Sequence, residues 1–309
     1  MNCKFLLISL ILLFIISSLV IILFRKNLKD NFIVDSMNNI YNNFTPYFKK
    51  EFYNIYKSPN KNYVDINIPY DSTYQNKTVY RLWCNIDPLY YCGGRVGEKF
   101  PLEYTMNNLP GWKQVIFGNK EKEEFMYKYF GKNHIITKAY FMINPKFQVA
   151  RSDLLRYLII YVHGGLYLDF KSCIISKLPE IPFDKDLVVK TWHHKINLFN
   201  QGEIINWFVY GKRGSPIIKD IINQIVYNIL HFKECLYFKS IINDNEPQSK
   251  KIILATTGPI AVTIAIIKSD NRFKIEYNNK KYSMIIYNCN KNKQIDSNHY
   301  SQIKEELII

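Results

Sequence analysis

Apolar runs and mixed stretches alternate along residues 76–309, and this alternation predicts strands and helices in turn. The short apolar runs predicted as strands are residues 79–83, 114–117, 166–170, 187–190 and 282–287. The longer stretches predicted as helices are residues 121–130, 147–163, 216–232 and a segment that opens at 256–259. Short strands that alternate with helices are typical of an α/β sheet, so we expect one α/β domain over residues 76–309.

An apolar segment stands near the start of the chain. Residues 5–24 contain no charged side chain, and as a helix of about 30 Å they are long enough to cross one hydrocarbon core. The sequence LFRKNLKD follows instead of a small-residue cleavage site, which predicts an uncleaved signal anchor within residues 1–26. Lys4 precedes the apolar run and Arg25, Lys26 and Lys29 stand beside its end, so charge does not choose the orientation in the membrane.

Residues 27–75 are polar, rich in Asn and Lys, and contain Pro46, Pro59 and Pro69. This composition is typical of a stem or linker between an anchor and a folded domain. Two glycosylation sequons, at Asn43 and Asn76, agree with a lumenal body, although such triplets also arise by chance in an Asn-rich chain.

The chain carries a large excess of positive charge, with 41 Lys and Arg against 26 Asp and Glu and a formal net charge of +15. This excess favours anionic partners such as phosphates, nucleic acid or lipid headgroups, and a coding bias toward Lys and Asn explains it equally well. No nucleic-acid recognition motif accompanies the charge, so nucleic acid is not an expected partner. The apolar fraction of 48% excludes global disorder.

The cysteines and histidines show no metal-binding spacing. Six cysteines occur without a C-x-x-C pair. Cys84 and Cys92 could close a small disulfide loop in a lumenal body, and unpaired, partly buried thiols are the alternative. His193 and His194 are adjacent, and adjacent side chains on a strand point apart, so we expect loop residues rather than ligands. The Gly-rich stretch CGGRVGEKF lacks the G-K-[ST] of a phosphate loop.

The helix predicted over residues 147–163 carries opposite charges among apolar residues. Asp153, Arg156 and Tyr157 lie at i, i+3 and i+4 and therefore share one helix face. Burial of such a charge pair is costly unless both charges have partners. The pattern leaves two interpretations open: an ion pair within the helix, or a pair directed into a cleft where it binds hydroxyl groups.

A Gly-Gly turn, a strand and an acid follow this helix at once. His163, Gly164 and Gly165 end the helix, and the strand LYLDF then carries Asp169. In open α/β sheets ligands bind beyond the carboxyl ends of the strands, where Asp169 is expected. A single Asp after a strand is more often a turn residue, but the unbroken succession of these elements favours a site.

The block INPKFQVARSDLLRYLIIYVHGGLYLDFKSCIISKL resembles the sugar-binding DXD region of glycosyltransferase family 32. That family includes the yeast outer-chain mannosyltransferases, and the large glucosylating toxins share its core. Similar stretches lie upstream in GWKQVIFGNKEKEEFMYKYF and downstream in EIINWFVYGKRGSPIIKDIINQIV and TTGPIAV. The resemblance covers most of residues 79–300.

The resemblance implies a GT-A-like fold, in which a mixed sheet binds a nucleotide-sugar at the ends of its strands. It places Asp153 and Arg156 at the hydroxyl groups of the donor sugar. Asp169 matches the first acid of the motif, which in relatives contacts ribose, sugar or metal. Trp83 matches an aromatic position that stacks on the base, and a packing role in the core or at an edge strand is equally open.

Lys171 departs from the family pattern, because most relatives carry there a second Asp that binds Mn²⁺. That metal neutralises the diphosphate leaving group. A charged Lys cannot ligate a metal, but its ammonium supplies positive charge directly. Three interpretations follow: Mn²⁺ or Mg²⁺ held by Asp169 with Asp296 or His299, metal-independent catalysis through Lys171, or loss of activity. Some family members share a Lys at this position, which disfavours loss of activity, and between loss of activity and charge supplied by Lys171 we expect the latter.

These features predict a membrane-anchored glycosyltransferase that moves a hexose from a nucleotide-sugar to a glycan or another hydroxyl acceptor. The hexose is of the mannose, galactose, glucose or GlcNAc type, and the resemblance implies retention of its anomeric configuration. The N-terminal helix predicts a single-pass membrane protein of type II with a lumenal, Golgi- or ER-like catalytic domain. The alternative is a catalytically inactive module of the same fold that binds sugar or glycan, and Lys171 is its main support.

Overall fold

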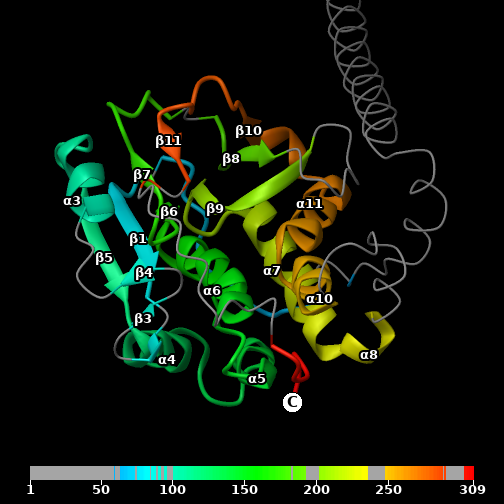
Figure 1. The fold of residues 1–309 in the computed structure, drawn as a ribbon. Coiled ribbons are helices and arrows are strands. Elements are labelled where there is room, and N and C mark those ends of the chain that lie inside the picture. The colour runs from blue at the N-terminus through cyan, green and yellow to red at the C-terminus, as the bar shows by residue number, and fades with distance from the viewer. Residues whose placement is uncertain are drawn as a thin grey trace, which may run out of the picture. The chain divides into compact units, whose positions relative to one another are not determined.

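The computed structural model describes part of the chain, and Figure 1 shows how its elements are arranged. The described residues are 59, 63–73, 75–83, 85–87, 90–91, 94–95, 100–181, 184–192, 202–235, 248–287, 289 and 303–309. The predicted anchor, most of the predicted stem and the first sequon lie outside these residues. The same holds for Cys84, Cys92, the two adjacent histidines, Asp296 and His299.

A six-stranded mixed sheet forms the centre of the described residues, with the order β10-β8-β9-β6-β1-β5. Its strands are β10 (Ile275–Tyr277), β8 (Leu187–Trp192), β9 (Glu203–Gly211), β6 (Gly165–Leu168), β1 (Thr78–Leu82) and β5 (Lys113–Phe117). Strand β1 is parallel to β5 and β6, and β8 is parallel to β10, whereas β9 is antiparallel to both β6 and β8. The prediction of an α/β domain with a mixed sheet is confirmed.

Two smaller sheets accompany the main one. Strands β7 (Cys173–Ile174) and β11 (Ile285–Ile286) pair antiparallel, and β2 (Asn85–Asp87), β3 (Tyr90–Tyr91) and β4 (Gly94–Arg95) form a three-stranded sheet. The strand predicted over residues 282–287 is wrong in its length. Residues 278–284 are mostly turns, with Tyr282 N–H bonded to the carbonyl of Asn278, and β11 alone is extended.

The helices include the four predicted ones and four that the pattern did not predict. They are α3 (Phe100–Asn107), α4 (Asn119–Phe130), α5 (Ile135–Met142), α6 (Gln148–His163), α7 (Pro216–Leu230), α8 (Phe232–Cys235), α10 (Gln248–Thr256) and α11 (Pro259–Lys268), with a 3₁₀ turn η1 at Arg272–Lys274. The prediction missed α3, α5, α8 and α10. Ser215 precedes α7 as expected, but its hydroxyl makes no capping hydrogen bond.

Helix α6 lies in the main hydrophobic core, which it shares with α7 and α11. All its residues from Ala150 to Val162 are buried, including the polar ones, so this helix has no solvent face over three turns. Such a helix lies in the interior of a domain, and its buried polar side chains need partners there. Its end at Gly164, whose N–H bonds to the carbonyl of Ile160, delivers the chain directly into β6.

Residues 63–70 pack against the body of the domain. Val64 and Ile66 belong to the main core, and the N–H of Val64 donates to the side-chain oxygen of Asn223 at 3.0 Å. The hydroxyl of Tyr70 donates to the buried carboxylate of Asp186 at 2.6 Å. The predicted boundary at residue 75 stays a prediction, and the structure adds that the chain contacts the body before that point.

Within the described part of the chain, one apolar helical stretch is long enough to cross a membrane, Ser249–Lys268. It comprises α10 and α11, and 72% of its apolar window is buried inside the protein. Core helices pass the same test of length and composition, so this stretch is weak evidence for a membrane span. The N-terminal anchor stays a prediction.

The turn between α6 and β6 requires glycine at its second position. Gly165 has a φ of +102°, and a Cβ there would lie 2.8 Å from the backbone oxygen of Thr78 in the neighbouring strand β1. Gly111 has a φ of +79°, but no atom lies within 4 Å of the Cβ position. Both glycines therefore carry the same kind of backbone constraint, and Gly165 alone of the two also faces a backbone atom.

We predict that Gly165→Ala lowers the free energy of unfolding by roughly 2–4 kcal/mol, from the strained φ and the forced separation of β6 from β1. The matched control Gly111→Ala pays for the backbone conformation alone and loses about 1–2 kcal/mol. Denaturant unfolding of the two variants measures the difference. Equal losses would show that the close approach of β1 does not constrain this turn.

Candidate functional site

The predicted site residues gather at the carboxyl ends of β1 and β6. These two strands are parallel neighbours, and Asp169 is the first residue after β6. Its N–H donates to the carbonyl of Trp207 at 2.9 Å, because the antiparallel strand β9 extends beyond the end of β6. Asp169 therefore lies at the edge of the sheet where an open α/β fold binds ligands, as the sequence predicts.

Helix α6 brings Asp153 and Arg156 beneath this edge. Nη2 of Arg156 lies 3.0 Å from Oδ1 of Asp153, and both side chains are at most 5% exposed. Nη1 of Arg156 also lies 3.4 Å from Oδ1 of Asp169. The sequence left open an ion pair within the helix or a pair directed toward a site, and the structure combines the two. Arg156 joins the carboxylate of its own helix to the carboxylate at the end of β6.

The buried carboxylate of Asp153 is fully surrounded by donors. Besides Arg156, it accepts hydrogen bonds from Nδ2 of Asn206 at 3.2 Å and from Oγ1 of Thr257 at 3.0 Å. Burial raises the pKa of Asp153 to about 6, while Arg156 and these two hydrogen bonds act in the opposite direction. Asn206 in turn accepts from the hydroxyl of Tyr157, the third residue of the predicted face, at 2.9 Å.

Arg156 is held on every side. Its Nε donates to the carbonyl of Ser152 at 3.1 Å, and its Nη1 donates to the carbonyl of Asn206. Its guanidinium carbon lies 4.7 Å from the ring centroid of Tyr167. Burial alone would lower the pKa of Arg156, but Tyr167 and the two carboxylates raise it above its ordinary value. The guanidinium is therefore a fixed positive charge below Asp169.

Asp169 is the more accessible of the two carboxylates, with 27% of its side chain exposed. The hydroxyl of Tyr167 donates to its Oδ1 at 2.8 Å, and Arg156 approaches the same oxygen. Both contacts use Oδ1, so Oδ2 keeps its capacity to accept hydrogen bonds from a ligand. Direct sugar contacts by the buried Asp153 and Arg156 stay a prediction, whereas the contact of Arg156 with Asp169 is visible.

Lys171 follows two residues later and is half-buried. Its Nζ lies 4.5 Å from the ring centroid of Tyr287, which comes from the chain just after β11. Burial lowers the pKa of Lys171, and the nearby Asp169 acts to raise it. The ammonium is thus paired with an aromatic face and lies near the carboxylate of the predicted site.

The described residues do not fit a divalent metal. Among them, no three His, Cys, Asp or Glu side chains lie close enough together to hold a metal ion. At the end of β6 the carboxylate of Asp169 already shares one oxygen with Tyr167 and Arg156, and an ammonium stands where a second acid would bind. The other predicted metal ligands, Asp296 and His299, lie outside the described residues.

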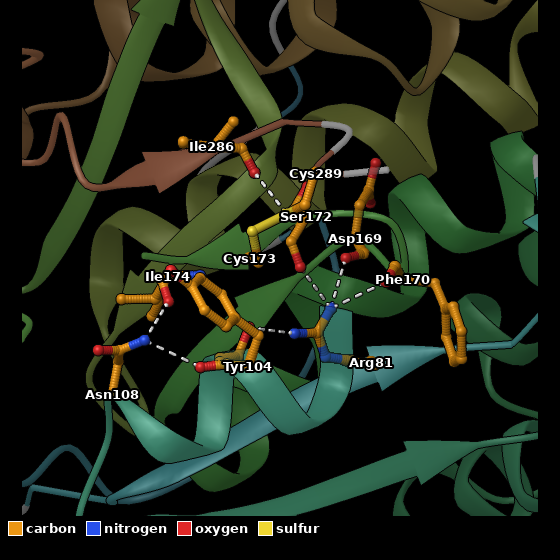
Figure 2. Close-up of a disulfide and its surroundings, with 11 residues drawn as sticks. Arg81, Tyr104, Asn108, Asp169, Phe170, Ser172, Cys173, Ile174, Ile286 and Cys289 are labelled. Carbon is orange, nitrogen blue, oxygen red and sulfur yellow. Dashed lines mark hydrogen bonds between the residues drawn. A yellow bond between two sulfur atoms is a disulfide. The ribbon is translucent and has the colours of Figure 1, made fainter. Parts of the chain in front are cut away.

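Arg81, which the prediction missed, supports the loop that carries Asp169 and Lys171. Figure 2 shows its guanidinium below this loop. Its Nη1 donates to the carbonyls of Asp169, Phe170 and Ser172 at 2.8, 3.1 and 2.9 Å, and Nη2 donates to Oγ1 of Thr105 at 3.0 Å. Arg81 is fully buried, and burial lowers its pKa to about 10. An Arg in the middle of the otherwise apolar strand VYRLW was the available signal, since a buried charge requires partners.

Trp83 lies just beyond the end of β1 and is half-buried. Its ring meets that of Phe170 edge-on, with 4.7 Å between the centroids. Its backbone N–H donates to the carbonyl of Phe117 at 2.8 Å. Trp83 therefore stands beside the loop 169–172. The alternatives of base stacking and packing both remain predictions.

A disulfide that the sequence analysis did not predict joins Cys173 to Cys289, two cysteines 116 residues apart with Cα atoms 6.0 Å apart (Figure 2). Cys173 begins β7, directly after the loop 169–172, and Cys289 follows β11. Cysteine spacing alone does not reveal which residues pair, because the pairing of β7 with β11 brings these two together.

A surface pocket of about 290 Å³ lies elsewhere, near the start of β1, and is lined by residues that include Asn76, Trp112 and Tyr210. None of the predicted site residues lines it. The charged residues of the predicted site converge at the opposite ends of the strands.

Comparisons with known proteins give matches that include this part of the chain. Residues 98–188 match the family model described as the glycosyltransferase sugar-binding region containing the DXD motif. The initiation-specific alpha-1,6-mannosyltransferase of Candida albicans is 22% identical over 202 residues, which cover 57% of this chain and 50% of that protein. The putative glycosyltransferase HOC1 of Saccharomyces cerevisiae is 24% identical over 138 residues, covering 40% and 34%. The chain thus spans half or less of the curated relatives.

Among solved structures, the PaToxG glycosyltransferase is 17% identical, covers 62% of this chain and 68% of its own, and has a TM-score of 0.44. The matched region 98–188 contains Asp153, Arg156, Asp169 and Lys171, the residues that converge at the end of β6. Residues 98–188 of this chain are thus similar to the sugar-binding region of DXD-containing glycosyltransferases, and the chain is similar over part of its length to these two yeast proteins.

Proposed function

We propose that this protein transfers a hexose from a nucleotide-sugar to a glycan or another hydroxyl acceptor, on a GT-A-like domain. The observation that carries the proposal is the pairing of Arg156 with Asp153 and Asp169 inside the matched sugar-binding region, at the carboxyl ends of β1 and β6. A ligand site at this edge agrees with the general rule for open α/β sheets. The hexose is of the mannose, galactose, glucose or GlcNAc type.

The proposed roles follow from accessibility. Asp169, the partly exposed carboxylate, accepts hydrogen bonds from hydroxyl groups of the donor through Oδ2. Arg156, which is itself held by Asp153, fixes the orientation of Asp169. A contact of Asp153 and Arg156 with the donor sugar, which the resemblance implies, requires these buried side chains to become accessible when the donor binds. Trp83, half-buried beside the loop, stacks on the base of the nucleotide. Transfer proceeds with retention of the anomeric configuration, and we assign no nucleophile.

Lys171 is proposed to take the place of the divalent metal. Breaking the bond between hexose and diphosphate places negative charge on the leaving group, and a fixed positive charge at that point stabilises the transition state. The ammonium of Lys171 is half-buried, which strengthens its interaction with a charge that develops nearby.

The proposed setting is a single-pass membrane protein of type II, with the predicted anchor in residues 1–26 and the catalytic domain in a Golgi- or ER-like lumen. The disulfide between Cys173 and Cys289 supports an oxidising compartment, because disulfides persist there and are rare in the cytosol. Nucleotide-sugar, glycan acceptor and membrane are the proposed partners.

A second candidate is a module of the same fold that binds a nucleotide-sugar or glycan without turnover. The Lys in place of the second acid is the observation that favours it. Binding of a donor without hydrolysis or transfer would support this candidate over the enzyme.

We predict that Asp169→Asn lowers turnover of the preferred donor by roughly 10²–10³-fold. The variant loses the negative charge that pairs with Arg156 and orients the donor. A panel of UDP- and GDP-sugars, assayed for release of the nucleotide diphosphate, identifies the donor and measures the loss. The matched control is Asp184→Asn, because the side chain of Asp184 is 72% exposed and forms an ion pair with its neighbour Lys185.

Wild-type turnover with both Asp variants equally active would contradict the role of Asp169. No release from any donor in the panel by the wild-type protein would overturn the proposed enzyme activity itself.

We predict that EDTA leaves donor turnover unchanged, because Lys171 supplies the charge that a metal provides in most relatives. Lys171→Ala should lower kcat by roughly 10²–10³-fold, as expected for the loss of one group that stabilises the leaving group. The control is Lys128→Ala, since Lys128 also lies over an aromatic ring, that of Tyr129. The ring of Tyr129 packs against His163, the last residue of α6. If EDTA abolishes turnover and added Mn²⁺ restores it, the metal-independent mechanism is wrong.

A further inference from the structure

The short loop of residues 169–172 must be fixed if Lys171 is to meet a diphosphate reliably. A Lys side chain is a flexible stem with a point charge at its end, so its position depends on what surrounds it. The loop connects β6 to β7 and carries both Asp169 and Lys171. Its backbone contacts show which parts of the protein hold it.

Two parts of the structure divide the carbonyl groups of this loop between them. Arg81 binds the carbonyls of Asp169, Phe170 and Ser172. The remaining carbonyl, that of Lys171, accepts the N–H of Cys289 at 3.0 Å. The backbone of Lys171 is therefore held from a segment that lies more than a hundred residues away in the sequence.

We call residues 284–287 together with Cys289 the C-terminal strap. It runs antiparallel to the chain that follows the loop: Ile175 N–H donates to the carbonyl of Met284 at 2.9 Å, and β11 pairs with β7. The disulfide between Cys289 and Cys173 then closes the end of the strap that lies beside the loop (Figure 2). Without this bond, the strap would be held by non-covalent contacts alone, among them the pairing of two strands of two residues each.

The strap carries Tyr287, whose ring centroid lies 4.5 Å from Nζ of Lys171. The same ring packs against Trp207 of β9, with 5.4 Å between the centroids. An aromatic face attracts an ammonium and so restricts where the Lys side chain points. The strap thus contacts Lys171 twice, through the backbone at Cys289 and through the side chain at Tyr287.

We infer that Tyr287 is a positioning residue for Lys171, and that the Cys173–Cys289 disulfide holds Tyr287 in place, so that turnover depends on the oxidised form of this pair. The inference rests on the proposed function, because it assigns Lys171 a task in the reaction. Reduction by dithiothreitol would transfer two electrons and two protons to the disulfide, which gives two thiols and the cyclic disulfide of the reagent. The strap would then lose its covalent link to the loop.

The first test uses the full-length chain purified in detergent, with release of the nucleotide diphosphate as the readout. The double variant Cys173→Ser/Cys289→Ser and the wild type in dithiothreitol should both show kcat lowered roughly 10-fold or more. Dithiothreitol should have no further effect on the double variant. The control Cys235→Ser should keep wild-type kcat and its sensitivity to dithiothreitol.

The second test leaves the disulfide intact and so separates positioning from loss of stability. Tyr287→Leu should lower kcat roughly 3- to 30-fold with little change in the KM for the donor, whereas Tyr287→Phe keeps the ring and should restore wild-type kcat. In a Lys171→Ala background, Tyr287→Leu should have no further effect. The control Tyr129→Leu removes the ring beneath Lys128 and should leave kcat unchanged.

The outcomes distinguish the inference from the function on which it rests. No turnover by the oxidised wild type overturns the proposed function, and the inference falls with it. Wild-type turnover with full kcat in Tyr287→Leu, or equal losses in the Leu and Phe variants, overturns the inference alone. The same holds if the double Cys variant is folded and fully active.

Discussion

The buried guanidinium of Arg156 contacts two carboxylates at once, and the other residues of the site are arranged around these two ion pairs. Its partners are Asp153 on the same helix and Asp169 at the end of β6. A buried charge pair loses much of its hydration energy, and the loss is offset only when every charged group has partners. Asn206 of β9 and Thr257 before α11 supply them for Asp153. The cost of burial therefore fixes α6, β6, β9 and the α10–α11 turn relative to one another.

The sequence allowed the local part of this arrangement to be predicted. The spacing of Asp153 and Arg156, the Gly-Gly turn and Asp169 after a strand all lie within 17 residues, and each depends on helix periodicity or on backbone geometry. Helix α6 and strand β6 accordingly appear where they were predicted. The departure at Lys171 was also visible, because a motif position can be read without knowing its surroundings.

The remaining contacts could not be predicted because they join distant parts of the chain. Thr257 reaches Asp153 across 104 residues, and Arg81 reaches the carbonyl of Ser172 across 91. No periodicity encodes such pairs, and Cys173 and Cys289 reveal their pairing only through β7 and β11. Strand β9 lacks the regular alternation of a half-buried strand, since eight of its nine residues are buried. Among these residues, Arg81 alone could have been recognised from the sequence, because a charge within an apolar strand requires buried partners.

The central claim is that a nucleotide-sugar binds at the ends of β1 and β6 with its diphosphate against Lys171 and its hexose against Asp169. A crystal structure of the protein with an intact, non-hydrolysable nucleotide-sugar tests this most directly. The account predicts the ammonium of Lys171 within hydrogen-bond distance of a diphosphate oxygen and a hexose hydroxyl on Asp169. A donor bound in the pocket near Asn76 and Tyr210, or a metal ion between Asp169 and the diphosphate with Lys171 turned away, would contradict it.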